Sequence, residues 1–193
     1  MDTRVDGFQW GEELPFISAK CVRLRPLNEG DVPALFEIFS DPEVMRYWDS
    51  PALKSPAGAA RLLQQIQQNF VARTFFQWGI EEAGEGQAIG TCTLFNVNKN
   101  HRRAEVGFAL ARAKWGQGLM TDALDCLIEF AFTKMGLHRL EADADPRNIK
   151  SLRALERQGF RREGLLRDRY HHNGEIQDAV FLGLLRSERT RAT

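Results

Sequence analysis

One stretch of the sequence, residues 105–123, holds the charged side chains and glycines whose types and spacing suit the binding of a phosphate-bearing ligand. It opens with the carboxylate of Glu105, at the start of a short apolar run, where a carboxylate can serve as a general base. Two basic residues follow, Arg112 and Lys114, and then a Gly-Gln-Gly turn at residues 116–118. After the turn, apolar residues recur at helical spacing. A strand, a glycine turn and a helix are therefore predicted in succession.

The glycine turn is typical of a site for a phosphate-bearing ligand. The first N–H groups of a helix lack acceptors within the helix and lie at the positive end of its dipole. Gly116 and Gly118 can adopt positive φ, and their missing side chains let a ligand approach the backbone. Thr121 replaces the third glycine of the dinucleotide fingerprint, and no Gly-Lys-Ser/Thr follows. These departures argue against a dinucleotide or a nucleoside triphosphate and for another phosphate-bearing cofactor.

Two motifs resemble a known family. Residues 105–110 (EVGFAL) and 115–123 (WGQGLMTDA) are similar to the acetyl-CoA-binding segment of the GNAT N-acetyltransferase superfamily. Both glycines of its signature, Gln/Arg-x-x-Gly-x-Gly/Ala, are kept, with Ala113 at the Gln/Arg position. Residues 148–151 (NIKS) and 156–160 (ERQGF) resemble a second motif of this superfamily. Within it the likeness is to the Rim-type group, which acetylates the N-termini of ribosomal proteins, and to its relatives that acetylate small molecules.

The resemblance implies acetyl-CoA as the co-substrate and a primary amine as the acceptor, on either a protein N-terminus or a small molecule. Backbone N–H groups near Phe108 and Leu110 would hold the pantetheine arm and the acetyl carbonyl. Ser151 would donate a proton to the leaving sulfur, because Leu155 stands where many members carry a tyrosine. The residues implied to contact acetyl-CoA are Phe108, Ala109, Leu110, Arg112, Lys114, Gly116, Gln117, Gly118, Leu119, Met120, Thr121 and Asn148.

Each chemical candidate also has a structural interpretation. Glu105 acts as the base, directly or through a water, or it forms an ion pair with Arg102 or Arg103. Asn148 is either a contact to pantetheine or only a helix N-cap, and Ser151 is either the acid or a polar residue of the first helical turn. The acceptor side is predicted to be lined by Trp48, Trp78, Asn96 and Tyr170. The alternative to an enzyme is a non-catalytic acyl-CoA-binding or sensing module on the same fold.

Composition narrows the class of protein. The 193 residues suit one domain, and 26 basic and 26 acidic side chains give a formal charge of zero, which argues against a general nucleic-acid or membrane binder. Three cysteines without CxxC spacing favour reduced thiols in the cytoplasm. No group of His, Cys or carboxylates has the spacing of metal ligands, so no metal is expected. A homodimer is left open.

The elements that must position these residues follow from periodicity and turn signals. Strands are predicted at residues 21–27, 75–81, 89–97, 105–110 and 139–145, followed by a final hairpin that turns at Asn173-Gly174. Helices are predicted to follow Asn28, Ser55 and Gly118, and a short last helix is predicted to begin at Asn148. This order predicts an α+β domain with a mixed, mostly antiparallel sheet of six to seven strands, flanked by about four helices. The single GNAT-like domain would span residues 1–193 with a core at 21–185, and residues 1–16 either wrap the surface or are mobile.

Overall fold

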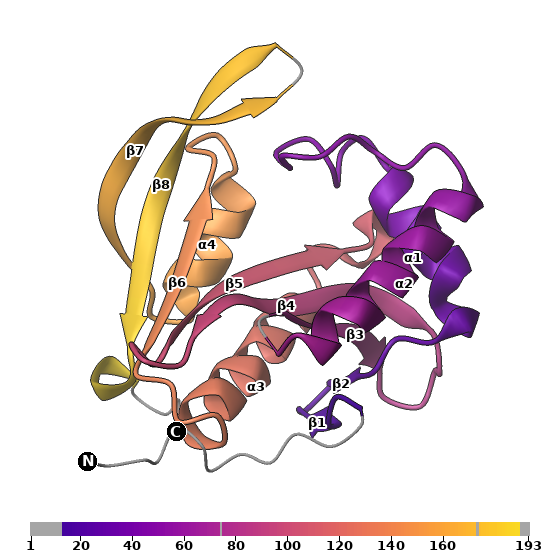
Figure 1. Cartoon of the computed structure of the whole chain (residues 1–193), viewed down its shortest axis with the longest axis horizontal. Helices are drawn as coiled ribbons and strands as arrows, with labels where there is room; N and C mark the ends of the chain where they lie inside the picture. The colour runs from indigo at the N-terminus through magenta and orange to yellow at the C-terminus, as the bar shows by residue number, and fades with distance from the viewer. Residues whose placement is uncertain (1–12, 74, 173, 190–193) are drawn as a thin grey trace.

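The structure is a computed structural model that describes residues 13–73, 75–172 and 174–189. Within these residues four α-helices flank an eight-stranded sheet of order β1-β2-β3-β4-β5-β6-β8-β7 (Figure 1). The strands are β1 (Ile17–Ser18), β2 (Val22–Arg25), β3 (Phe76–Glu82), β4 (Ala88–Asn98), β5 (Arg103–Leu110), β6 (Arg139–Ala144), β7 (Arg161–His172) and β8 (Glu175–Leu185). The helices are α1 (Val32–Ser40), α2 (Pro56–Val71), α3 (Leu119–Thr133) and α4 (Ile149–Arg157).

The sheet is antiparallel except where β5 meets β6. These two strands are parallel because α3 connects them as a crossover, whereas the other neighbouring pairs in the described sheet are antiparallel. The predicted α+β class with a mixed, mostly antiparallel sheet is confirmed. The sheet has one strand more than the predicted maximum. That strand is β1, which at two residues is too short to show any alternation.

Helices cover the two faces of the sheet over different areas. α3 and α4 pack on one face, and α1 and α2 pack on the other, as the two core clusters show. Alternation along β5 follows this division: Val106 belongs to the cluster of α3, and Ala109 belongs to the cluster of α1 and α2. Glu105 and Gly107 share the face of Ala109. The sheet therefore turns the candidate base toward the face of α1 and α2.

Buried charges fasten the edge of the sheet near α1. Arg25 on β2 donates to both carboxylate oxygens of Asp31 at 2.6 and 2.7 Å, and its Nε also donates to Glu81 on β3. Burial by itself would raise the pKa of Asp31. Hydrogen bonds from Arg25 and from the backbone of Asn28 overcome this effect, so the pKa of Asp31 lies below its ordinary value. The cluster joins β2 and β3 to the turn that precedes α1.

The segment before β1 packs against the sheet where it is described. Leu14 is buried, and the Pro15 carbonyl accepts a hydrogen bond from the indole of Trp78 at 2.9 Å. Leu14 and Pro15 therefore contact the domain, whereas residues 1–12, for which wrapping or mobility was also expected, lie outside the described residues. No helix in the described ranges is long and apolar enough to span a membrane.

Candidate active site

β5 and β6 lie side by side only at their beginnings. The parallel ladder between them ends with the pair Glu105–Glu141. Beyond this pair β5 continues beside β4, and β6 continues beside β8. The two strands diverge in Figure 1, so residues 106–110 of β5 have no strand partner on that side in the described part of the chain.

The ladder on the other side shows which backbone groups lie along this open edge. Ala111 N–H donates to the Ile89 carbonyl at 2.8 Å, and hydrogen-bonded pairs alternate along an antiparallel ladder. The N–H and C=O groups of Phe108 and Leu110 therefore point away from β4. In agreement, the Leu110 carbonyl accepts the indole N–H of Trp115 at 2.8 Å. An extended ligand that carries amide groups can pair with such an edge as a strand would.

α3 begins at the end of this open edge, after the glycine turn. Gly116 and Gly118 have φ of +76° and +80°, and a Cβ at either position would meet nothing within 4 Å. These glycines are required for their conformation in an open turn. No side chain caps the helix, and its first backbone bond runs from Asp122 N–H to Gly118 O. The N–H groups of residues 119–121 therefore lack acceptors within the helix and suit a pyrophosphate.

The two basic residues beside the turn differ in their surroundings. Lys114 donates to Glu82 on β3 at 2.8 Å, and this hydrogen bond raises the pKa of Lys114. Its ammonium is thereby directed toward β3. Arg112 is exposed and has no ion pair within the described ranges. Arg112 is the better candidate for a phosphate contact.

The first turn of α4 packs near the same site. The Asn148 side-chain oxygen accepts the Ser151 N–H at 3.2 Å, so Asn148 is the N-cap of α4. Its amide nitrogen can still donate to a ligand. Ser151 is half-buried in the first turn, and the Lys150 ammonium lies 4.1 Å from the ring centroid of Trp115. This cation–π contact joins α4 to the segment that carries the glycine turn.

Glu105 lies where the open edge begins, and Asn96 is its hydrogen-bond partner. The Asn96 Nδ2 donates to Glu105 Oε1 at 3.0 Å. The ion pair considered from the sequence is not formed within the described residues. Arg103 instead pairs with Glu141 at 2.5 Å. The carboxylate of Glu105 therefore lacks a cationic partner there.

The predicted acceptor residues have different environments. Trp78 has no exposed surface and packs edge-on to Phe130 of α3, so its prediction as an acceptor contact is wrong. The reason is the sheet pleat, which turns Trp78 into the core. Trp48 is half-buried in the loop after α1, with its ring 5.5 Å from that of Phe39. Tyr170, on β7, is half-buried.

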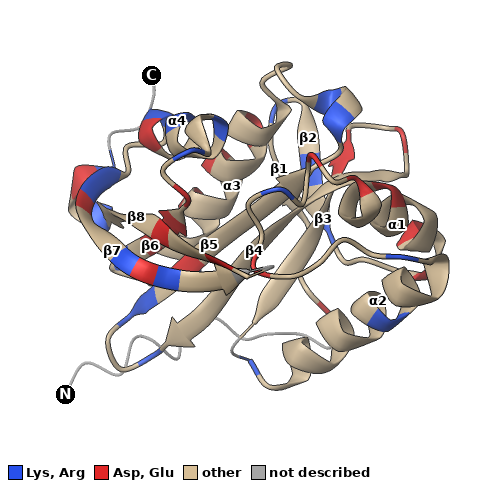
Figure 2. Cartoon of the chain, turned by 90° about the horizontal axis from the view of Figure 1, so that it is seen from above, with Lys and Arg blue, Asp and Glu red and all other residues tan. Residues whose placement is uncertain are grey.

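Tyr170 is held by a residue that sequence reasoning missed. Its hydroxyl donates to Asp143 on β6, at 2.8 Å from both carboxylate oxygens. Burial, and then the nearby Asp143 carboxylate, raise the pKa of Tyr170 to about 12, so the hydroxyl stays protonated at neutral pH. Asp143 shares one face of β6 with Glu141 and Arg139, and this alternation of charged residues in the sequence is the signal that could have identified it. Figure 2 shows further acidic and basic residues along β7.

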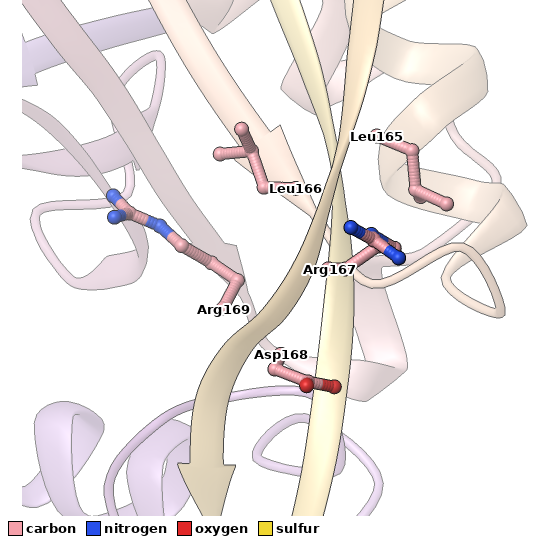
Figure 3. Close-up of a pocket in the computed structure, with 5 residues that line it drawn as sticks. All are labelled: Leu165, Leu166, Arg167, Asp168 and Arg169. Atoms are coloured by element: carbon pink, nitrogen blue, oxygen red, sulfur yellow. The ribbon is translucent and has the colours of Figure 1, made fainter.

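Two hollows in the described surface differ in whether candidate site residues line them. A cleft of about 590 Å³ adjoins the glycine turn and the first turn of α3, and can receive the phosphate end of a ligand. Its lining combines the basic side chains of Lys20, Arg157 and Arg189 with the acidic side chains of Asp122, Asp125 and Glu188, beside Gln117, Gly118 and Thr121. The second, about 650 Å³, is open and is formed by residues 165–169 of β7 alone (Figure 3). It contains none of the candidate groups, so the site is assigned to the first region.

The arrangement defines a class of protein. An open strand edge suits an amide-bearing arm, an uncapped helix suits a pyrophosphate, and the carboxylate at the start of the edge suits proton transfer. Acetyl-CoA has both the pyrophosphate and the amide-bearing arm, so the residues present fit it. In the described part of the chain, no group of three or more His, Cys, Asp or Glu residues is placed to hold a metal ion. These features are those of an acyl-CoA-dependent transferase.

Comparison with known proteins gives the family. Residues 22–161 match the family described as acetyltransferase (GNAT) domain. The Uncharacterized N-acetyltransferase p20 of Bacillus licheniformis is 32% identical, over 86% of this chain and 93% of its own. Spermidine N(1)-acetyltransferase of Escherichia coli (strain K12) is 28% identical, over 84% of this chain and 85% of its own. The chain therefore belongs to the GNAT acetyltransferase family.

Solved structures agree with this assignment at the level of fold. RimJ of Mycobacterium smegmatis in complex with CoA-disulfide has a TM-score of 0.80 at 24% identity, over 90% of this chain and 87% of that chain. The protein is an N-acetyltransferase that transfers an acetyl group from acetyl-CoA to an amine. The predictions of the family, the enzyme class and the co-substrate are confirmed. The family match and the named relatives favour an enzyme over a non-catalytic acyl-CoA-binding module.

Proposed function

We propose that this N-acetyltransferase binds acetyl-CoA along the open edge of β5 and receives its amine acceptor over the face that carries Glu105. One observation supports this placement above all: the β5–β6 ladder ends at the Glu105–Glu141 pair. The proposed base thus stands where the free backbone edge begins. An amine and an acetyl group can meet there without a change in the sheet.

Residues on three elements would hold acetyl-CoA. The N–H groups at the start of α3, with Arg112, bind the pyrophosphate. The Phe108 and Leu110 backbone groups bind the pantetheine arm, and the Asn148 amide donates to it. When bound, acetyl-CoA supplies an activated acetyl thioester.

The remaining chemistry is assigned to side chains of this protein. Glu105 attracts the positively charged amine and takes one of its protons, which leaves the nitrogen lone pair free to attack. A β5 N–H group donates to the carbonyl oxygen and stabilises the negative charge that develops there. Ser151 would donate its hydroxyl proton to the departing sulfur and take up the second proton of the attacking nitrogen, so that its hydroxyl is restored. No step requires a metal ion.

The acceptor is proposed to be a primary amine that fits between the loop of Trp48 and the β7 strand of Tyr170. The related spermidine N(1)-acetyltransferase acts on a small polyamine, as its name states. The Rim-type likeness favours a protein N-terminus. Because Glu105 lacks a cationic partner among the described residues, either acceptor can be attracted there by its charge. The two acceptors are separated by assay.

The test is a transfer assay with spermidine and with short peptides that have a free N-terminus, read as thiol release and as acetylated product. Glu105→Gln keeps the shape of the side chain and removes the proton acceptor. We expect turnover to fall about 10²- to 10⁴-fold while acetyl-CoA still binds. Glu85→Gln, in the exposed β3–β4 turn, is the control and should match the wild type. Normal turnover by Glu105→Gln would refute the base assignment.

The proposal extends to partners and location. We propose a cytoplasmic enzyme, consistent with the free cysteines Cys21, Cys92 and Cys126. Neither nucleic acid nor membrane is expected to bind, because the formal charges balance. A homodimer remains an expectation, which light scattering on the purified protein tests directly.

A further inference from the structure

Asn96 has a backbone conformation that few residues adopt. Its φ is +49°, in the left-handed region, at an irregularity of the β4–β5 ladder between the pairs Phe95–Glu105 and Asn98–Arg103. Asparagine tolerates this region better than most residues, although glycine fits it more easily. Asn96 is exposed, so core packing does not explain the choice. Non-glycine residues with such strain are found often at functional sites.

The amide of Asn96 contacts the proposed base. Its Nδ2 lies 3.0 Å from Glu105 Oε1. An ionised carboxylate can only accept hydrogen bonds, so the amide must donate. This bond fixes one carboxylate oxygen and limits rotation of the side chain. The other oxygen, Oε2, remains available to an incoming amine.

Charged groups around Glu105 are engaged elsewhere. Arg103, on the same face of β5, pairs with Glu141 on β6 at 2.5 Å. Arg139 also donates to Glu141, at 2.7 Å, and to Glu163 on β7. The contact from β4 is the neutral amide of Asn96. A cation in its place would fix the carboxylate but also neutralise it, whereas an amide fixes it and preserves its charge.

We propose that Asn96 is a positioning residue that orients Glu105 for proton transfer, and that the left-handed turn in β4 serves to aim its amide. This inference rests on the proposed role of Glu105 as the base. It assigns Asn96 a task other than lining the acceptor site. Its effect is on turnover and its pH dependence, with little effect on acetyl-CoA affinity.

The first test is Asn96→Gly, which keeps the left-handed backbone and deletes the amide. We expect kcat to fall roughly 10- to 100-fold, the usual cost of a misplaced reacting group. The KM for acetyl-CoA and the melting temperature should stay near the wild-type values. Arg102→Gly is the matched control: Arg102 is exposed, has φ of +48° and lies in the connection between β4 and β5, close to Asn96 along the chain. It should retain wild-type kcat.

The second test is Asn96→Asp, which places a second carboxylate beside the first. Two carboxylates at this distance compete for one proton, so the acidic limb of the kcat/KM profile should move to higher pH. A purely structural Asn96 would change the melting temperature without moving this limb.

The outcomes separate the two assignments. Wild-type kcat in Asn96→Gly, together with an inactive Glu105→Gln, would overturn the role of Asn96 and leave Glu105 as the base. An unmoved acidic limb in an active Asn96→Asp would also overturn it. Full turnover by Glu105→Gln would overturn both. A fall in kcat for Asn96→Gly and Glu105→Gln, with Arg102→Gly unaffected, supports both.

Discussion

Among individual residues, the glycines of the turn contribute through conformation. Gly118 ends the turn at φ of +80° and leads directly into α3. Its Cβ position faces open space, so a side chain there would have no clash within the protein. A larger residue would instead occupy the side from which a phosphate approaches the N–H groups of the helix.

Gly118→Val is expected to lower acetyl-CoA affinity by more than tenfold and to cost about 1–2 kcal/mol of stability, because an L residue is strained at positive φ. Titration calorimetry and a melting curve measure the two effects. Gly84→Val is the matched control, with φ of +92° and open space in the β3–β4 turn. It should lose similar stability and keep its affinity. Equal affinity in Gly118→Val would exclude this turn as the pyrophosphate site.

Among elements, the sheet edge at β2 and β3 depends on buried charge. The side chain of Asp31 is 3% exposed and that of Glu81 is 2% exposed, and both pair with Arg25. These buried carboxylates stay ionised because the arginine and backbone donors stabilise the charged form. Both carboxylates have pKa values below their ordinary values, despite burial that would raise them.

This cluster of buried charges makes the free energy of unfolding depend on pH in the acidic range. A lowered carboxyl pKa contributes stability that is present above the unfolded value of about 4 and is lost as pH falls through the lower folded value. Chemical denaturation at several pH values should therefore show the free energy of unfolding fall below about pH 4. Asp31→Asn should cost about 3 kcal/mol at neutral pH and should make this acid dependence shallower.

Glu85→Gln, in the exposed turn, should keep the wild-type acid dependence and serves as the control. An acid dependence that is equally steep in Asp31→Asn would show that other carboxylates dominate acid unfolding.

For the whole molecule, acetyl-CoA would connect parts that the sheet leaves apart. The proposed contacts lie on β5, at the start of α3 and at the start of α4, on both sides of the divergence. A ligand at 100 times its Kd that binds only the folded state adds about 2.7 kcal/mol to stability. The greatest local effect should be where the ligand replaces a missing strand.

Amide hydrogen exchange followed by NMR tests this effect. Bound acetyl-CoA should slow exchange at Phe108 and Leu110, whose N–H groups face the open edge. Ala109 is the internal control, because its N–H points to β4 and is already bonded in the free protein. Slowing at Ala109 equal to that at Phe108 would indicate general stabilisation, and no slowing at Phe108 would refute pairing of the ligand with this edge.

The sequence alone determined much of the molecule. Local signals were enough for the helices and most strands: Pro56 opens α2, Asn148 caps α4, and the glycines before Leu119 precede α3. The motifs were enough for the family, because backbone binding needs glycines at fixed spacing. Short or irregular elements could not be predicted from such local signals. β1 has two residues, and a pattern of period two cannot be recognised in so short a run.

The tertiary structure decided which groups meet. Glu105 and Asn96 were separate candidates, and only the register of β4 against β5 brings them into contact. The same applies to Arg103, which pairs across the sheet with Glu141 instead of with its neighbour in sequence. Trp78 lies in the core and not at the acceptor site. Strand alternation predicts that residues share a face, but it does not indicate which face a helix covers. Periodicity depends on near neighbours along the chain, whereas side-chain partners depend on strand order and register, which arise only when distant segments pack together.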